Sequence, residues 1–208
     1  MGLGFQENAD GNVVPPLINA INQGLLDEPL FTVYLNKEGS QEYTMGGVIT
    51  YGALDTVHCS QDFSYYPLTS TKQFLIKLDS VTFGSHSFST GWNVLIDTST
   101  PLFGGPPNII ETIRETLGGT YDDDQGIFYI NCNATFEPIF FSINGKQYPI
   151  KQEQLMFQLE PGKCILWLTK LDAEYAGFDW LFGYSWIRSF CTVFDFGQKR
   201  IGFAKTIL

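Results

Sequence analysis

Residues 93–100, Asn93-Val-Leu-Ile-Asp97-Thr98-Ser99-Thr100, place an aspartate between a short apolar run and a turn rich in hydroxyl groups. A short apolar run bounded by turn residues is typical of a buried β-strand. An aspartate at its end either caps the turn or takes part in acid–base chemistry. The position of Asp97 alone favours the capping role, because Asp and Thr at strand ends commonly form hydrogen bonds with the local backbone.

The rest of the chain consists mostly of patterns typical of strands. Apolar residues at alternating positions or in short runs predict strands at 31–35, 43–51, 74–83, 88–96, 138–143, 146–150, 164–168, 191–196 and 201–204. Asn144-Gly145 is a strong hairpin signal, since this dipeptide suits the two-residue turns that match strand twist. Segment 36–41 is predicted to connect the first two strands, and the turn 84–87 to place His86, as a solvated residue, at a hairpin tip.

Short helices are expected at three places. Pro15-Pro16 and Pro106-Pro107 each precede apolar residues at helical spacing, and glycine follows both stretches, at Gly24 and at Gly118. A third helix is expected at 185–190. The 208 residues are 15% aromatic and only 16% charged, which favours strands packed into sheets over surface helices. The fold class is therefore predicted to be all-β with short helices.

The net charge excludes several classes of partner. Twelve basic and 22 acidic residues give a formal net charge of −10, which would repel nucleic-acid phosphates and anionic lipid surfaces. No run approaches the ~20 apolar residues of a membrane span. We therefore expect neither nucleic acid nor a membrane as a partner. The acidic run 122–124 lacks the spacing of a calcium loop and is interpreted as a solvated loop.

The chain has four widely spaced cysteines, which are Cys59, Cys132, Cys164 and Cys191. None of them forms a closely spaced pair, and neither His58 nor His86 completes a zinc motif, so no metal or other cofactor is expected. The even number of cysteines and the sequon Asn133-Ala134-Thr135 indicate an oxidising compartment, two disulfides and a glycan acceptor at Asn133. Residues 1–5 lack the features of a signal peptide, so we expect a longer amino-terminal part to be missing.

The ordered segments of the chain resemble those of the pepsin family of aspartic endopeptidases, nearly from end to end. Residues 95–100, Leu-Ile-Asp97-Thr-Ser-Thr, lie where the family has its second Asp-Thr-Gly-Thr. The other segments that resemble the family are 46–52, 140–150, 180–183, 186–190, 192–195 and 200–204. Within the family, the resemblance points to nematode members, and it implies disulfides between Cys132 and Cys164 and between Cys59 and Cys191.

The resemblance implies a role for each residue around this loop. Asp97 would be one of two catalytic aspartates, Thr98 would bond the matching loop of the other lobe, and Thr100 would support the outer carboxylate oxygen. Residues 181–183 would thread beside the loop, and Ile187 would line an apolar substrate pocket. For residues 181, 182 and 187 the alternative interpretation is packing in the core.

The resemblance also divides the chain at residue 30. Residues 1–29 would be the tail of a first lobe, a strand and a helix, and residues 30–208 the C-terminal lobe of the bilobed fold. The Asp-Thr-Gly of the first lobe has no counterpart in the sequence. The missing N-terminal lobe would therefore be a partner, together with a peptide or protein substrate, and the full-length protein would be extracellular or lysosomal.

Three residues depart from the family pattern beside the catalytic loop. Ser99 replaces a glycine of the substrate-binding loop, and it would crowd the paired carboxylates with its Cβ or disturb their hydrogen bonds. Pro101 replaces a small hydroxyl residue and removes a backbone donor, and Tyr184 stands where the family usually has aspartate. Three hypotheses follow: a partial aspartic endopeptidase that is inactive alone, a pseudo-protease that binds peptides or proteins in a retained groove, and a symmetric dimer in which two Asp97 residues meet.

Overall fold

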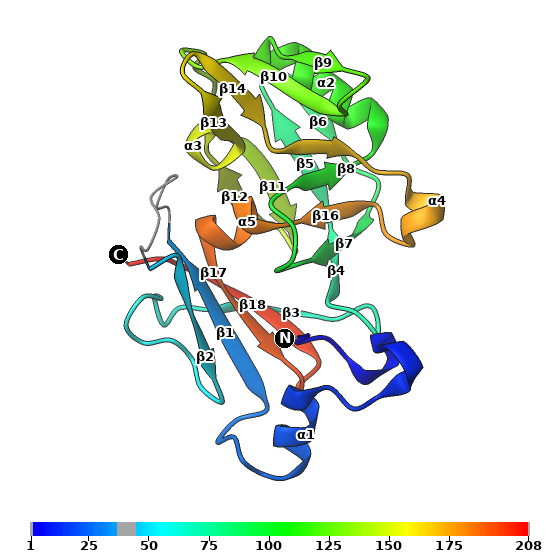
Figure 1. The fold of residues 1–208 in the computed structure, drawn as a ribbon, viewed down its shortest axis with the longest axis vertical. Helices are drawn as coiled ribbons and strands as arrows, with labels where there is room; N and C mark the ends of the chain where they lie inside the picture. Colours follow the sequence, from blue (N-terminus) through cyan, green and yellow to red (C-terminus); the bar gives the residue numbers. More distant parts are fainter. Residues whose placement is uncertain (1, 37–44, 208) are drawn as a thin grey trace. The chain divides into compact units, whose positions relative to one another are not determined.

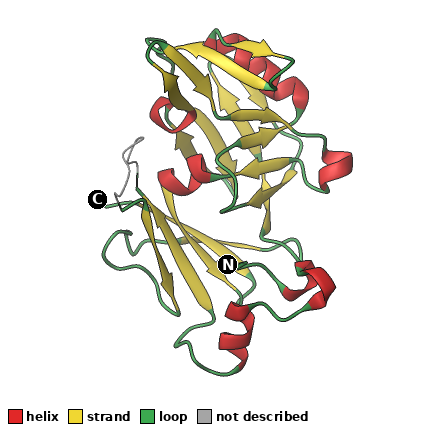
Figure 2. Cartoon of the chain, viewed as in Figure 1, coloured by secondary structure: helices red, strands yellow, loops and turns green. Residues whose placement is uncertain are grey.

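The computed structural model describes residues 2–36 and 45–207, and the chain divides into two compact units. Unit 1 comprises residues 1–76 together with 187–208, and unit 2 comprises residues 77–186. Most of the regular secondary structure in each unit is strand, and the helices are short (Figure 1; Figure 2). The predicted all-β class with short helices is confirmed.

Unit 1 contains one five-stranded sheet with the order β2-β1-β17-β18-β3, in which every neighbouring pair is antiparallel. Its strands are β1 (Leu30–Leu35), β2 (Gly47–Tyr51), β3 (Ser64–Pro67), β17 (Phe190–Asp195) and β18 (Arg200–Lys205). The predicted hairpins β1–β2 and β17–β18 are confirmed. Residues 37–44, which include most of the predicted connection 36–41 and the start of the predicted strand 43–51, lie outside the described residues.

The amino-terminal segment of unit 1 contains η1 (Gln6–Asn8), η2 (Asp10–Asn12) and α1 (Pro16–Asn22). Pro16 occupies the first position of α1, where its missing N–H removes no helical hydrogen bond. The predicted helix is therefore confirmed. The strand that the resemblance implied before this helix is not found among residues 2–29, where 3₁₀ turns take its place.

An aromatic cluster attaches this segment to the sheet of unit 1. Phe31 on β1 stacks on Phe194 of β17, with ring centroids 4.6 Å apart. The ring of Phe74 lies 4.8 Å from that of Phe194, and Phe5 packs against both Phe74 (4.8 Å) and Phe196 (4.9 Å). Tilted and edge-to-face aromatic contacts of this kind stabilise a core beyond simple burial. Phe5 thus anchors a segment that contributes no strand.

Unit 2 is built from three sheets with the orders β15-β8-β16-β7-β4, β12-β11-β5-β6 and β13-β14-β10-β9. Its strands are β4 (Leu75–Leu78), β5 (Ser80–Phe83), β6 (His86–Phe88), β7 (Trp92–Ile96), β8 (Phe103–Gly105), β9 (Thr120–Asp122), β10 (Ile127–Asn131), β11 (Ile139–Ile143), β12 (Lys146–Ile150), β13 (Met156–Glu160), β14 (Lys163–Leu166), β15 (Leu168–Lys170) and β16 (Trp180–Phe182). Its helices are α2 (Pro107–Leu117), α3 (Gln152–Leu155), α4 (Ala173–Ala176) and α5 (Tyr184–Ser189). The division between the units falls inside β4 and inside α5.

Local turn chemistry accounts for the elements that the sequence predicted in unit 2. Asn144 (φ 49°) and Gly145 (φ 76°) form the turn of the β11–β12 hairpin, where positive φ angles match the twist of the strands. Helix α2 ends at Gly118 (φ 72°), whose N–H donates to the carbonyl of Glu115. Both predictions are confirmed.

Three predicted strands are each divided between different sheets. The prediction of one strand over 88–96 is wrong because residues 89–91 belong to no strand and separate β6 from β7, which lie in different sheets. The prediction of one strand over 74–83 is wrong because Asp79 interrupts it, and β4 and β5 on either side of Asp79 lie in different sheets. The N–H of Asp79 donates to the carbonyl of Ser142 (2.8 Å), and its carboxylate accepts from the N–H of Gly145 (2.9 Å). The predicted strand 164–168 divides at Trp167, whose N–H donates to the carbonyl of Leu155 (2.8 Å).

The β5–β6 turn is shorter than the predicted 84–87. Gly84 (φ 53°) and Ser85 form it, and His86 pairs with Phe83 as the first residue of β6. The His86 ring is half-buried and stacks on Phe83, with ring centroids 5.4 Å apart. The prediction that His86 is a solvated residue at a hairpin tip is therefore wrong.

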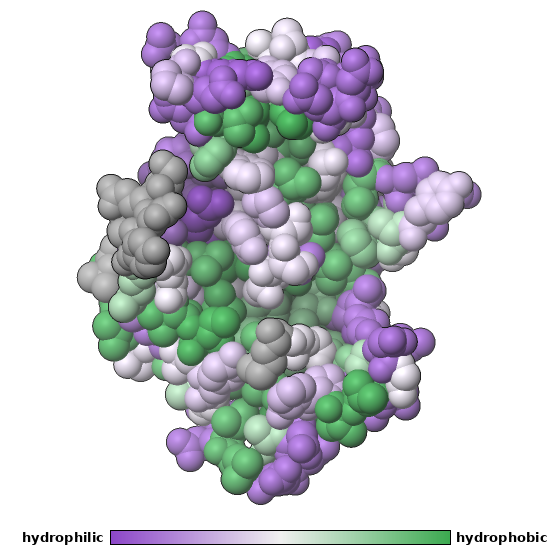
Figure 3. Space-filling model, viewed as in Figure 1, coloured by the Kyte–Doolittle hydropathy of each residue, from purple (hydrophilic) through white to green (hydrophobic). Residues whose placement is uncertain are grey.

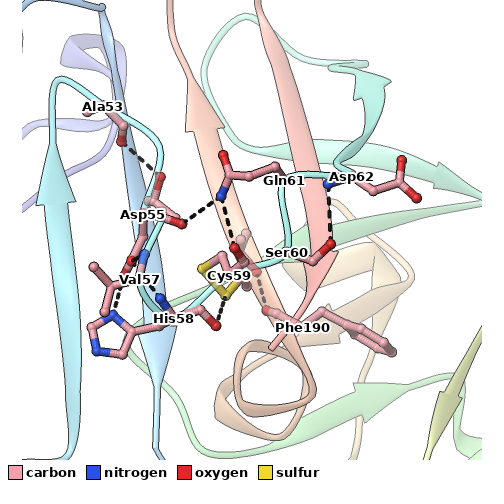
Figure 4. The surroundings of a disulfide bond; sticks show 12 residues. Ala53, Asp55, Val57, His58, Cys59, Ser60, Gln61, Asp62 and Phe190 are labelled. Carbon is pink, nitrogen blue, oxygen red and sulfur yellow. Dashed lines mark hydrogen bonds and ion pairs between the residues drawn. A yellow bond between two sulfur atoms is a disulfide. The ribbon is translucent and has the colours of Figure 1, made fainter. Parts of the chain in front are cut away.

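Both implied disulfides are present. Cys59, on the loop after β2, is bonded to Cys191 of β17 in unit 1, and Figure 4 shows the loop around it. Cys132, just after β10, is bonded to Cys164 of β14 in unit 2. Each disulfide therefore connects segments within one unit.

The described surface carries scattered apolar side chains among polar ones. Tyr175 on α4 is 91% exposed and Leu25 after α1 is 68% exposed. Figure 3 shows polar residues interspersed with apolar ones on the face that it presents. Exposed apolar residues that are scattered in this way are usual in folded proteins and need no special role.

Candidate active site

Asp97 lies directly after β7, on the loop 97–102 that leads to β8. These two strands are not neighbours in their sheet, because β16 lies between them (Figure 1). β16 runs parallel to β7, with Phe182 opposite Ile96, and antiparallel to β8, with Phe182 opposite Phe103. The predicted placement of residues 181–183 beside the Asp97 loop is thus observed.

Three backbone hydrogen bonds hold the loop against the end of β16. The N–H of Asp97 donates to the carbonyl of Phe182 (3.0 Å). The N–H of Gly183 donates to the carbonyl of Leu102 (3.1 Å), and that of Tyr184 to the carbonyl of Thr100 (2.9 Å). The loop is therefore fixed at both ends and in the middle by one short segment that lies more than 80 residues further along the chain.

Gly183 is required by how closely these two segments approach. A Cβ built on Gly183 would lie 2.7 Å from the carbonyl oxygen of Leu102 and would also collide with that of Thr100. Both obstacles are backbone atoms, which cannot rotate away as a flexible side chain would. The close approach of these two segments therefore fixes the position of the loop that carries Asp97. A side chain that takes part in catalysis would need such a fixed position.

The carboxylate of Asp97 accepts its hydrogen bonds from Ser99. The N–H of Ser99 donates to Oδ1 (2.8 Å), which is the turn-capping contact predicted from the position of Asp97. The Ser99 hydroxyl Oγ lies 2.7 Å from Oδ1 and 2.8 Å from Oδ2. Sequence reasoning expected Ser99 to crowd the carboxylates or to disturb their hydrogen bonds, but it did not identify this contact, because the choice of a serine rotamer leaves no trace in a sequence.

Thr98 and Thr100 flank Ser99, and both are partly exposed. Oγ1 of Thr100 accepts from the N–H of Leu102 (3.3 Å), so its hydroxyl supports the loop. The contact of Thr100 with an outer carboxylate oxygen and the contact of Thr98 with another lobe stay predictions. Pro101 contributes through its carbonyl, which accepts from the hydroxyl of Ser185 (3.4 Å).

Ile187 lies on α5, where it is 0% exposed and belongs to unit 1. Its burial agrees with the alternative interpretation of core packing, and its role in a substrate pocket stays a prediction. Asn133 lies just after β10 and is exposed, and its backbone N–H donates to Oδ1 of Asn131 (2.9 Å). Its side chain is therefore accessible to a modifying enzyme, as a glycan acceptor must be.

A buried carboxylate that sequence reasoning missed lies on the loop before Cys59 (Figure 4). Asp55 is 4% exposed and accepts from the N–H groups of Val57 and His58, both at 2.9 Å, and from Nδ1 of His58 at 2.7 Å. The His58 ring also stacks on Tyr34 of β1, with centroids 4.6 Å apart. The Asp-x-x-His spacing in a turn was the available sequence signal.

Opposing influences act on the pKa of Asp55. Burial is the largest single influence and would raise this pKa, since it disfavours the charged form. The hydrogen bonds from the backbone and ring of His58 and from Val57 together outweigh burial, and they hold the pKa below its ordinary value of 3.8. Asp55 therefore stabilises this loop as a charged group.

The described residues give no support for a metal site or a membrane span. Within 2–36 and 45–207, no group of three or more His, Cys, Asp or Glu side chains is placed to hold a metal ion. In the acidic run, Oδ1 of Asp122 accepts from the N–H groups of Asp124 and Gln125, and Asp123 and Asp124 are exposed. The predicted solvated loop is confirmed for Asp123 and Asp124, whereas Asp122 is the last residue of β9 and is partly buried. No helix in the described part of the chain is long and apolar enough to cross a membrane.

Comparison with known proteins identifies relatives along the whole chain. Residues 1–206 match the sequence profile of the family described as eukaryotic aspartyl protease. Aspartic protease 6 of Caenorhabditis elegans is 37% identical over 207 residues, which are 100% of this chain and 53% of that protein. Aspartic protease 2 of Necator americanus is 35% identical over 204 residues (98% and 48%), and pepsin A of Bos taurus is 31% identical over 209 residues (98% and 55%).

An all-β fold with an aspartate held on a loop between two strands, and with relatives of this kind, defines a pepsin-like protein of the protease class. The chain belongs to the eukaryotic aspartyl protease family. The resemblance seen in the sequence, including its nematode character, is confirmed. The chain spans about half the length of the relatives that it matches.

Proposed function

We propose that this chain is the second half of a pepsin-like aspartic endopeptidase, in which Asp97 is one of two catalytic carboxylates. The other carboxylate would come from an N-terminal lobe that precedes residue 30 in a longer protein. The observation that carries the proposal is the position of Asp97 at the end of β7, on a loop fixed by three backbone hydrogen bonds to residues 182–184. A loop fixed in this way supports the proposal, because a catalytic carboxylate of this kind must lie at a set distance from the second carboxylate.

The chemistry follows from placing two carboxylates together. Like charges at close range cannot both ionise easily, so the pair shares one proton and acts as a neutral acid beside a charged base. The charged carboxylate takes a proton from water as the water oxygen bonds to the peptide carbonyl carbon, and the acid protonates the carbonyl oxygen. As the tetrahedral intermediate collapses, the carboxyl group that took the proton from water gives it to the leaving nitrogen, the C–N bond breaks, and the other carboxylate takes back a proton from a hydroxyl of the intermediate.

The substrate proposed is an extended peptide or unfolded protein with apolar side chains, and Ile187 would contribute to an apolar pocket for it. An extracellular or lysosomal location is proposed for the full protein. The two disulfides and the exposed sequon at Asn133 support it, since both belong to oxidising, secretory compartments.

The test is cleavage of acid-denatured haemoglobin by the longest protein expressed from the native locus, at about pH 3 to 5, where a carboxylate pair works. Asp97→Asn is the decisive variant, because it keeps the size of the side chain and removes its acid–base function. We expect cleavage that is lost in Asp97→Asn while the thermal unfolding of the protein is unchanged. Cleavage that persists in this variant would show that Asp97 is not catalytic.

A second candidate function is a pseudo-protease that binds peptides or proteins without cutting them. The hydroxyl of Ser99, which contacts both oxygens of Asp97, favours it. The full-length protein would then be folded and inactive towards haemoglobin, and it would still bind peptides from an acid digest of haemoglobin in isothermal titration calorimetry. Cleavage by the wild-type protein that depends on Asp97 would exclude this candidate.

A further inference from the structure

Ser99 contacts both oxygens of the Asp97 carboxylate. Oδ1 lies within hydrogen-bond distance of both the N–H (2.8 Å) and the Oγ (2.7 Å) of Ser99, and Oδ2 lies 2.8 Å from the same Oγ. Each carboxylate oxygen has two lone pairs. Ser99 has two protons to donate, one on its backbone nitrogen and one on Oγ, so it fills two of these four acceptor positions at a time.

The position of Oγ matters more than the number of contacts. Because Oγ is almost equally far from the two oxygens, it lies in the fork of the carboxylate, at the place where a water molecule or a ligand hydroxyl would contact both oxygens. A hydroxyl has one proton and donates it to one oxygen at a time. In this rotamer, however, Oγ itself occupies the fork, so no other atom can enter it, whichever oxygen receives the proton.

We propose that Ser99 is a positioning residue that restrains this site, because its hydroxyl fills the Asp97 carboxylate fork and must rotate away before the attacking water can bind there. This inference rests on the proposed function of Asp97 as a catalytic carboxylate. It assigns to Ser99 a role that differs from the crowding by Cβ expected from the sequence.

The geometry permits such a rotation without a change in the loop. The Ser99 side chain is exposed, so another rotamer has room in solvent. The backbone of Ser99 stays in place, because its N–H remains bonded to Oδ1 and its neighbour Thr100 is held by the N–H of Tyr184. Rotation therefore costs the hydrogen bond to a charged acceptor and little else.

The experiment compares variants at position 99 in the longest protein expressed from the native locus, with kcat and KM measured on a fluorogenic peptide obtained from a haemoglobin cleavage site. Ser99→Ala removes the hydroxyl and keeps Cβ, Ser99→Gly removes both, and Ser99→Thr keeps the hydroxyl. Ser85→Gly, in the exposed β5–β6 turn, is the matched control for a serine replaced by glycine. Thermal unfolding of each protein verifies that it is folded.

We expect Ser99→Ala and Ser99→Gly to raise kcat by roughly 10-fold, since a hydrogen bond to a charged group no longer has to be broken before water binds. KM should stay unchanged, because the contacts with the peptide remain the same. Ser85→Gly should keep the wild-type kcat, and Ser99→Thr, which keeps the hydroxyl, should not raise it. An inactive wild-type protein together with an active Ser99→Ala variant would also support the proposal. It would mean that the Ser99 hydroxyl keeps the attacking water out of the fork completely.

Two outcomes overturn the inference, and they are distinguishable. If the wild-type protein cleaves the peptide in an Asp97-dependent manner and Ser99→Ala has the same or a lower kcat, the restraint is wrong and the proposed protease function stands. If the folded wild-type, Ser99→Ala and Ser99→Gly proteins all fail to cleave, the proposed function is wrong, and the inference that rests on it fails too.

Discussion

Gly183 is the residue whose size sets the distance between the end of β16 and the Asp97 loop. We predict that Gly183→Ala lowers the free energy of unfolding by about 2–3 kcal/mol, because its Cβ collides with two backbone carbonyls that cannot move independently. Urea unfolding measures this change. Gly46→Ala is the control, since a Cβ at Gly46 meets no atom within 4 Å. Equal stability of the two variants would contradict the close approach described for the loop.

Asp55 gives the chain a stability that depends on pH. The folded-state pKa of Asp55 lies below 3.8, so its charged form is favoured by folding, and its contribution is fully present above pH 3.8. This contribution is lost as the pH falls through the lowered folded-state pKa. We predict that Asp55→Asn costs about 1–3 kcal/mol at pH 6 and that the difference from wild type shrinks below about pH 4.

Urea unfolding of both proteins at pH 6, 4 and 2.5 provides this measurement. Asp123→Asn, at an exposed position of the acidic loop, is the matched control and should differ little from wild type at any of these pH values. A difference between Asp55→Asn and wild type that grows on acidification would have the wrong sign for a lowered pKa and would refute the prediction.

Among the elements, the two disulfides close loops of very different lengths. Cys59 and Cys191 are 132 residues apart, and Cys132 and Cys164 are 32 residues apart. A crosslink removes more conformational entropy from the unfolded chain when its loop is longer, which amounts to about 5 kcal/mol for the first loop and about 4 kcal/mol for the second. Cys59 and Cys191 are also fully buried, so alanine at these positions leaves unfilled volume.

We therefore predict that the double variant Cys59→Ala/Cys191→Ala loses more stability than Cys132→Ala/Cys164→Ala. Urea unfolding without reductant measures both, with the wild-type protein as reference. The reverse order would show that structure remaining in the unfolded chain, rather than loop length, determines these contributions.

The elements also show what a sequence reveals and what it does not. The β11–β12 turn and the end of α2 could be predicted, because each depends on the backbone conformation of the residues that form it. Asn144, Gly145 and Gly118 adopt the positive φ angles that these two features need. Asp79 could not be recognised as a break between two strands, since its partners Ser142 and Gly145 lie more than 60 residues away. The insertion of β16 beside the Asp97 loop was expected only through the family resemblance, because the pairing of distant strands has no local signal.

At the scale of the whole molecule, the proposed boundary at residue 30 separates a segment without strands from the sheet of unit 1. The described residues 2–29 contact this sheet through Phe5, and the carbonyl of Pro29 accepts from the N–H of Phe196 (3.0 Å). The contact of Pro29 belongs to the entry into β1. Residues 2–28 also contribute the buried side chain of Leu17, which is 4% exposed, and a hydrogen bond from the N–H of Glu28 to the carbonyl of Gly52 (3.0 Å), so the ring of Phe5 supplies only part of their contacts.

We predict that a chain that begins at Pro29 still folds and is about 2–5 kcal/mol less stable than the whole chain, since it loses the contacts of Phe5 with Phe74 and Phe196 and also the buried side chain of Leu17. Phe5→Ala in the whole chain should lose less, about 1–3 kcal/mol, because it removes the ring and leaves the rest of the segment in place. Urea unfolding of the three proteins measures both effects. If the shortened chain fails to fold while Phe5→Ala remains stable, the boundary at residue 30 divides a single folding unit.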